Sequence, residues 1–178
     1  MVYFTADTHF GHADVIRLCC RPFETLEEMD ERMIKNWNER VEPTDSVYVL
    51  GDMFFRCEDP EAILRRLHGR KHLIIGNHDS DWMQKVDVLK YFASAELMAE
   101  ISDGTRAMTV CHYPLMTWKH HARSYMVHGH IHENTATEFW PYIKGNGRIL
   151  NAGVDVNGFR PVTFDEMLAN NISFKAAH

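Results

Sequence analysis

The sequence predicts an α/β fold in which the carboxyl ends of several strands meet at one metal site. Short apolar runs alternate along the chain with amphipathic stretches, as they do when strands alternate with helices. Five of these apolar runs are followed, directly or after one glycine, by a histidine, a carboxylate or an asparagine. Because ligands in open α/β sheets bind beyond the carboxyl ends of the strands, loops from five strand ends would bring these residues together.

The individual elements follow from hydrophobic periodicity. Strands are expected at residues 2–6, 46–50, 72–75, 106–111 and 125–127, with one or two more within 149–156. Helices are expected at residues 25–41, 60–67 and 163–170. Thr25 and Glu28 have the spacing of a capping box at the start of the first of these helices. Its buried face is expected to recur every fourth residue, at Met29, Met33, Trp37 and Val41.

A single domain is expected over residues 1–178, because the length is that of one compact domain and no repeat or linker interrupts it. The content of 45% hydrophobic and 25% charged residues is typical of globular proteins. The formal net charge of −6 argues against a broad nucleic-acid surface, which would need many basic residues. A nucleotide or a nucleic-acid end stays open as a substrate, since bound metals would supply local positive charge.

The cysteines and the N-terminus predict a reduced, cytoplasmic protein without a membrane partner. The four cysteines form no CxxC pair and no disulfide framework. The first residues lack the basic and apolar regions of a signal peptide. No apolar run approaches the roughly 18 residues that a membrane-spanning helix needs.

The residues at the strand ends form five clusters of possible metal ligands. Histidine is the commonest metal ligand, and the chain contains 12. These clusters offer carboxylate, imidazole and amide-oxygen ligands and no thiolate, a combination that suits Mn, Fe, Zn, Ni or Mg. If two such cations lay next to each other, they would need an anionic ligand as a bridge between them. The clusters are Asp7-Thr8-His9, Gly51-Asp52, Gly76-Asn77-His78-Asp79, His112 and Gly129-His130-Ile131-His132.

The spacing inside the clusters makes a further prediction about geometry. If strand geometry persisted through them, Asp7 and His9 would point to the same side, and so would His130 and His132. The glycine that begins three of the clusters would permit a tight turn and a close backbone approach to a phosphate. Each of these residues alone could be an ordinary turn residue or a structural histidine. The prediction of a metal site therefore depends on the ordered set of clusters.

In this order, from Asp7 to His132, the five motifs resemble the calcineurin-like metallophosphoesterase superfamily. The opening Asp7-Thr8-His9-Phe10-Gly11-His12, with Arg21-Pro22-Phe23 and Asn36-Trp37-Asn38 downstream, is similar to a small bacterial and phage branch of it. The resemblance implies two sheets in an α/β sandwich flanked by helices, with two divalent metal ions at one sheet edge. Affinity order favours Zn, whereas availability and oxygen-rich ligation favour Mn or Fe, and we expect Mn.

The resemblance also implies a role for each site residue. One metal would be bound by Asp7, His9 and His132. The other would be bound by Asn77, His112 and His130. Asp52 would bridge the two metals, and a bridging hydroxide would attack phosphorus. His78 would act as the acid or charge stabiliser without binding metal, and Asp79 would orient it.

The chain departs from many relatives at one position, because Phe55 stands where they have a second aspartate three residues after the bridging one. This difference weakens the analogy with the protein-phosphatase and long cyclic-nucleotide-phosphodiesterase branches. His12 and Arg56 are candidates for contact with the substrate phosphate. The alternatives are a helix N-cap or surface position for His12 and a solvated position for Arg56. Arg21 and the pair His120-His121 are left without a role.

The function expected from these residues is hydrolysis of a phosphate monoester or diester of a small, nucleotide-like molecule. A nuclease or phosphatase that processes nucleic-acid ends is the alternative. A third candidate is a non-catalytic scaffold on the same fold, which we would expect to lack the histidine of the Gly-Asn-His motif. The chain keeps His78, so the scaffold is the least favoured of the three.

Overall fold

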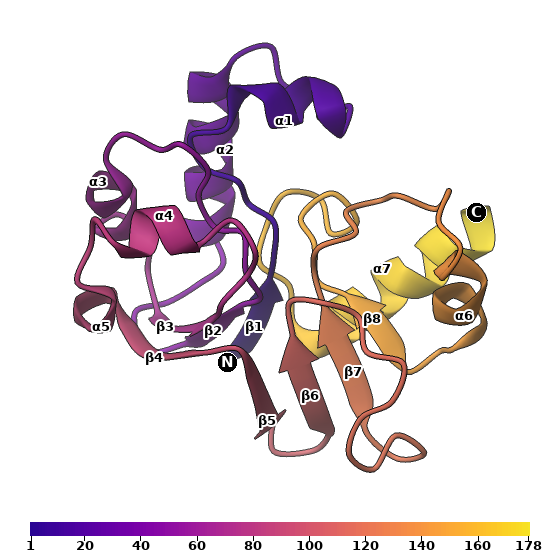
Figure 1. The fold of residues 1–178 in the computed structure, drawn as a ribbon. Coiled ribbons are helices and arrows are strands. Elements are labelled where there is room, and N and C mark those ends of the chain that lie inside the picture. The colour runs from indigo at the N-terminus through magenta and orange to yellow at the C-terminus, as the bar shows by residue number, and fades with distance from the viewer.

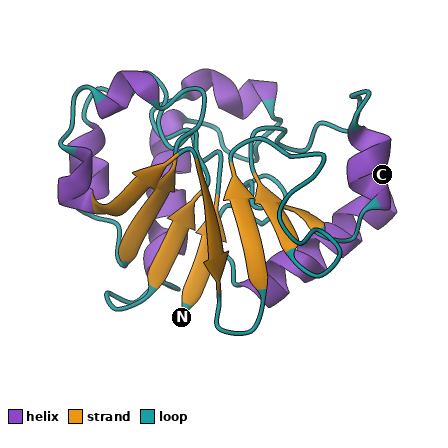
Figure 2. Cartoon of the chain, turned by 60° about the horizontal axis from the view of Figure 1, so that its bottom comes forward, coloured by secondary structure: helices purple, strands orange, loops and turns teal.

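Two four-stranded sheets lie next to each other at the centre of the protein, with helices on the outside (Figures 1 and 2). The computed structural model describes residues 1–178. The first sheet has the order β1-β2-β3-β4 and is parallel throughout. Its strands are β1 (Val2–Thr5), β2 (Ser46–Val49), β3 (Arg70–Ile74) and β4 (Phe92–Glu96).

The second sheet has the order β5-β6-β7-β8. Only the edge strand β5 runs antiparallel, and the other pairs are parallel. Its strands are β5 (Met98–Ser102), β6 (Ala107–Cys111), β7 (Tyr125–His128) and β8 (Ile149–Asn151). The two sheets and their flanking helices confirm the predicted α/β architecture.

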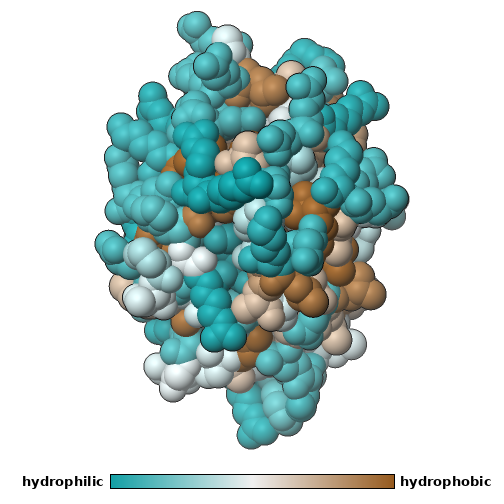
Figure 3. All heavy atoms as spheres, turned by 90° about the vertical axis from the view of Figure 1, so that its left-hand side faces the viewer, coloured by the Kyte–Doolittle hydropathy of each residue, from teal (hydrophilic) through white to brown (hydrophobic).

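The helices divide between the two sheets (Figure 1). The first sheet is accompanied by α1 (Ala13–Leu18), α2 (Leu26–Asn38), α3 (Pro60–Leu64), α4 (Ser80–Met83) and α5 (Val88–Tyr91). The second is accompanied by α6 (Trp140–Gly145) and α7 (Phe164–Ala177). None of these helices is long and apolar enough to cross a bilayer. Hydrophilic side chains cover most of the face that carries α3, α4 and α5, with apolar ones in smaller patches between them (Figure 3).

The core has two main parts, which lie on opposite faces of the first sheet. Tyr3 of β1 packs in the cluster that contains the predicted buried face of α2. Phe4, the next residue along, packs in the cluster shared with the second sheet and α7. Side chains on both faces of a strand are buried in this way when a parallel sheet is covered on both sides.

Most of the expected helices and strands are confirmed, but several begin or end at other residues than expected. Thr25 caps α2 by accepting a hydrogen bond from the backbone N–H of Glu28. The Glu28 side chain accepts from Glu24 instead of Thr25, so the reciprocal bond of a capping box is missing. The strand expected within 149–156 ends at Asn151, and α7 runs seven residues past the expected end at 170. The short helices α1, α4, α5 and α6 and the strands β4 and β5 were not predicted.

Candidate metal centre

The carboxyl ends of β1, β2, β3, β6 and β7 bring the predicted ligands together in two groups. In each group the ligand atoms lie within 4.8 Å of one another. The first group contains Asp7, His9 and His132. The second contains Asp52, His112 and His130. The structure therefore joins residues that are up to 125 positions apart in the sequence into two sets of the predicted composition.

Asp52 lies between the two groups. Its Oδ2 is 3.4 Å from His112 Nε2 in its own group and 3.8 Å from His9 Nε2 in the other. Asn77 completes the second group, because its Oδ1 lies 3.0 Å from the same Nε2 of His112. A carboxylate that lies between the two ligand groups is the anion that a pair of cations would need as a bridge.

The backbone at these ligands is in an unusual conformation. Nine residues other than glycine have a positive φ angle, and five of them are expected ligands. The five are Asp7 (55°), His9 (51°), Asp52 (53°), His130 (70°) and His132 (49°). Such residues are uncommon and concentrate where function over-determines the backbone. Strand geometry therefore does not persist through these clusters: left-handed turns, not strand alternation, aim Asp7 and His9 into the same centre.

The glycines before the ligands make room for ligands from neighbouring loops. A Cβ atom built on Gly129 would lie 2.6 Å from Asp7 Oδ2, and one on Gly76 would lie 2.6 Å from the backbone nitrogen of Asp52. Real Cβ atoms do not approach other atoms so closely. We expected the glycines to allow approach to a phosphate, but in the structure the space beside them is filled by the protein's own ligands.

Gly129→Ala is therefore expected to displace Asp7 and weaken cation binding at the first ligand group. The backbone N–H of the next residue, His130, also donates to both oxygens of Asp7, at 3.0 and 2.9 Å, so the two loops cannot separate freely. Metal content per chain after dialysis measures the effect. Gly147→Ala is the matched control, since nothing lies within 4 Å of a Cβ there. Equal metal retention in the two variants would contradict this explanation of Gly129.

Hydrogen bonds fix which nitrogen faces the centre in two of the ligand rings, His112 and His132. His112 Nδ1 lies 2.8 Å from the carbonyl oxygen of Leu50 and donates to it, which leaves Nε2 for a cation. His132 Nδ1 lies 2.7 Å from Asp155 Oδ2 and donates to it in the same way. A partner on the outer ring nitrogen is the usual arrangement for a metal-binding histidine, because it sets the tautomer and the orientation of the ring.

Arg21 connects this arrangement to the rest of the site. Its guanidinium donates to both oxygens of Asp155, at 2.8 and 3.1 Å. It also donates to the carbonyl oxygens of Asp7 (2.7 Å) and Thr8 (2.9 Å). Arg21 is only 4% exposed. The sequence left Arg21 without a role, but Arg21 and Asp155 together hold His132 and the Asp7 loop. No local signal in the sequence indicates this role, because the two residues are 134 positions apart.

The charges of the ligands suit cation binding. Burial alone would raise the pKa of Asp52, but the facing His112 imidazole, together with the His78 backbone N–H and His9, outweighs it and lowers the pKa to about 2. Burial raises the pKa of Asp7 to about 6. Burial also lowers the pKa of His9 to about 2, which keeps this ring neutral and able to bind a metal. The centre thus offers carboxylates together with at least one neutral imidazole.

His9 provides the clearest test of whether these residues fit a metal. The residue is 3% exposed, yet neither ring nitrogen has a hydrogen-bond partner in the protein. Buried polar atoms are nearly always satisfied, and an unpartnered one requires an explanation. A cation between His9, Asp7 and His132 would satisfy the inward ring nitrogen. The donor set and this orphaned ring both fit the predicted metal pair.

Asp79 does not orient His78 as we expected. Its oxygens accept hydrogen bonds from the backbone N–H groups of Asp52, Met53 and Gly76, at 2.7–2.9 Å, and from the Trp82 indole at 2.7 Å. All of these donors differ from the His78 ring. Asp79 therefore positions the loop that carries Asp52, because those N–H groups have no strand partner once β2 and β3 have ended.

His78 lies beside the ligand groups and belongs to neither. Its Nε2 is 4.0 Å from Asp52 Oδ2, and its side chain is 40% exposed. The backbone N–H of His78 donates to Asp52 Oδ1 at 2.9 Å. Phe55, at the position where many relatives have the second aspartate, packs edge-on against the His78 ring at 4.8 Å. The ring is thus held near the centre with its polar edge accessible.

The two candidate substrate contacts flank His78. The His12 ring lies 5.3 Å from the His9 ring and 4.3 Å from Phe55. His12 is the N-cap residue of α1, but its side chain makes no capping hydrogen bond. Arg56 and His78 line the same hollow, which has a volume of about 430 Å³. Both candidates therefore lie at the edge of the centre, whereas His120 and His121 are exposed on the loop before β7.

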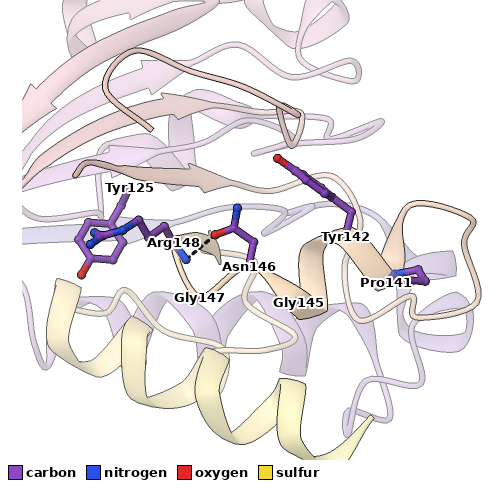
Figure 4. Close-up of a pocket in the computed structure, with 7 residues that line it drawn as sticks. All are labelled: Tyr125, Pro141, Tyr142, Gly145, Asn146, Gly147 and Arg148. Carbon is purple, nitrogen blue, oxygen red and sulfur yellow. Dashed lines mark hydrogen bonds between the residues drawn. The ribbon is translucent and has the colours of Figure 1, made fainter. Parts of the chain in front are cut away.

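Two further hollows border the ligand groups, and a third lies away from them. One of about 520 Å³ includes His130 and His132, and another of about 370 Å³ includes His130. A larger hollow of about 760 Å³ lies beside the turn between α6 and β8 and is lined by Tyr125, Tyr142 and Arg148 among others (Figure 4). This larger hollow contains no carboxylate and no imidazole, so we place the functional site at the hollows that border the ligand groups and His78.

The fold and the two ligand groups define a metal-dependent phosphoesterase type of centre. A profile of the family described as calcineurin-like phosphoesterase matches residues 1–172. This chain therefore belongs to the calcineurin-like phosphoesterase family. The match covers every residue discussed above as a candidate ligand.

Two of the similar proteins match more than nine tenths of this chain, and a third matches less than half of it. An uncharacterized protein of Methanocaldococcus jannaschii is 34% identical over 167 residues, which is 92% of this chain and 87% of that protein. The gene 66 protein of a Mycobacterium phage is 38% identical over 84 residues, 44% of this chain and 40% of that protein. A crystal structure of a protein of unknown function from Aquifex aeolicus has a TM-score of 0.73 at 26% identity, covering 93% of this chain and 96% of that one.

Proposed function

We propose that this chain hydrolyses phosphate esters of small organic molecules with two divalent cations, Mn²⁺ being the preferred pair. The position of Asp52 carries the proposal, because its carboxylate lies within 4 Å of imidazoles from both ligand groups. One cation would be held by Asp7, His9 and His132, and the other by Asn77, His112 and His130. When bound, the pair supplies Lewis-acid chemistry, which activates water and neutralises phosphate oxygens.

The residues of the chain supply positioning and proton transfer. His78 donates a proton to the leaving oxygen or stabilises its developing charge, since its ring borders the centre without belonging to either ligand group. Arg56 and His12 bind phosphate oxygens from the same side. Asp155 and Arg21 keep the outer nitrogen of His132 protonated, so that the inner nitrogen stays free.

The proposal also includes the class of substrate and the cellular compartment. The net charge of −6 supports a small phosphorylated substrate such as a nucleotide over a long nucleic acid. All four cysteines are unpaired, which supports a reducing, cytoplasmic compartment. A nucleic-acid end is the alternative substrate, and the experiment below separates the two classes.

The test is hydrolysis of two matched substrates by metal-stripped protein that has been reloaded with Mn²⁺. The substrates are p-nitrophenyl phosphate, a monoester, and bis-p-nitrophenyl phosphate, a diester. We expect hydrolysis of at least one of them by the native chain, and loss of that activity in Asp52→Asn. Preference for the diester would direct the search to cyclic nucleotides and nucleic-acid ends, and preference for the monoester to small phosphorylated metabolites.

The result against the proposal is equally clear. If neither ester were cleaved with Mn, Fe, Ni or Zn while two metals remained bound, the proposed activity would be refuted. The non-catalytic scaffold would then be the better explanation of the same centre. Equal activity in Asp52→Asn would instead show that hydrolysis came from a contaminant or from another site.

A further inference from the structure

Exposed apolar side chains gather beside the second ligand group. Ten large hydrophobic residues of the chain are exposed. Four of them line the hollow of about 370 Å³ that opens next to His130: Tyr113, Met116, Phe139 and Tyr142. A volume of this size is typical of pockets that bind small organic ligands. Isolated exposed apolar residues need no explanation, but a cluster at the edge of a reactive centre does.

His130 connects the hollow to the metal centre. It belongs to the second ligand group and also lines the hollow. The ring of Tyr113 packs edge-on against the His130 ring at 4.6 Å and against His112 at 5.2 Å. A molecule whose phosphate lay on the ligand groups would therefore extend its organic part directly into this hollow.

The chemistry of the lining selects what can enter. No lysine, arginine, aspartate or glutamate lines the hollow. The Tyr142 hydroxyl already donates to the carbonyl oxygen of Met116, so it is not available to a ligand. Tyr142 also borders the larger hollow of Figure 4, where its side chain stands apart from the Asn146–Arg148 turn. The lining offers ring faces, a thioether and aliphatic groups, and few free hydrogen-bonding atoms.

We propose that this hollow binds a planar aromatic ring carried by the phosphate ester, such as an aryl group or a nucleobase read by its ring face. The inference deepens the proposed hydrolysis and rests on it. Aromatic rings pack favourably edge-on or offset against tyrosine and phenylalanine, and Met sulfur contacts rings favourably. The anionic phosphate would lie at the metals and the neutral ring at Tyr113, Met116 and Phe139, so charge is matched at both ends.

Binding of phosphonates to the Mn²⁺-loaded protein tests this inference without turnover. Phenylphosphonate, cyclohexylphosphonate and methylphosphonate carry similar charge and differ in the attached group. We expect phenylphosphonate to bind at least about tenfold more tightly than methylphosphonate by calorimetry, and more tightly than cyclohexylphosphonate. Met116→Ala and Phe139→Ala should bring the phenyl-to-methyl ratio toward one. Both positions are exposed, 77% and 46%, so truncation should leave the fold intact.

Leu89→Ala is the matched control, since Leu89 is 73% exposed on α5, far from the hollow. It should keep the native phenyl-to-methyl ratio. A ratio near one in the native protein, or equal binding of the phenyl and cyclohexyl compounds, would overturn the inference while leaving the proposed hydrolysis standing. Failure of all three phosphonates to bind would refute the phosphate site itself, and the inference with it.

Discussion

His78→Ala is expected to lower kcat by about 10²–10⁴ while both metals stay bound. The ring lies 4.0 Å from Asp52 but belongs to neither ligand group, so its removal should cost proton transfer and charge stabilisation without opening the centre. Steady-state hydrolysis of the better p-nitrophenyl ester, measured together with metal content, tests both halves of this expectation.

The control for this variant is His121→Ala, which removes an exposed histidine from the loop before β7. It should keep native turnover. Near-native turnover in His78→Ala would remove His78 from the mechanism. Loss of a metal in that variant would show that His78 is a ligand or supports one, which its present position does not suggest.

Arg21→Met is expected to lower the free energy of unfolding by about 3–5 kcal/mol, the usual cost of removing one partner from a buried ion pair. The change would leave the Asp155 carboxylate, whose side chain is only 2% exposed, with His132 as its remaining charged partner. It would also remove the donors to the Asp7 and Thr8 carbonyl groups. Chemical denaturation of the metal-free protein measures the effect apart from any contribution of bound cations.

Arg160→Met is the comparison, because Arg160 is exposed and its loss should change the free energy of unfolding by less than about 0.5 kcal/mol. Adding Asp155→Asn to Arg21→Met should recover part of the lost stability, since it removes the buried charge left without its guanidinium. Similar unfolding free energies for Arg21→Met and Arg160→Met would contradict the structural role of the pair.

The sequence predicts the strands that matter for the site and misses the edges of both sheets. The strands β1, β2 and β7 are buried apolar runs, and such runs are visible without a structure. In contrast, β5 is an edge strand with no fully buried residue, and β4 contains two alanines and a serine. Helices α4 and α5 have four residues each, which is too short for a helical period to be recognised.

The candidate ligands were predicted because their residue types and order are visible in the sequence. The residues that hold these ligands in position were not predicted. Asp155 and Arg21 are 134 positions apart, and nothing local joins them. The family resemblance implied that Asp79 orients His78, yet its carboxylate accepts hydrogen bonds from backbone N–H groups of two loops. The positive φ angles of Asp7, His9 and Asp52 likewise depend on tertiary contacts, because aspartate and histidine adopt them only occasionally.

A metal titration of the stripped protein, with hydrolysis followed at each point, tests the central claim most directly. If Asp52 joins two ligand groups into one centre, activity should rise with added Mn²⁺ and level off at about two equivalents per chain. Asp52→Asn should stay inactive at every metal concentration and bind at least one ion less tightly. Full activity at about one equivalent, or activity that does not depend on metal, would contradict a two-metal centre built on Asp52.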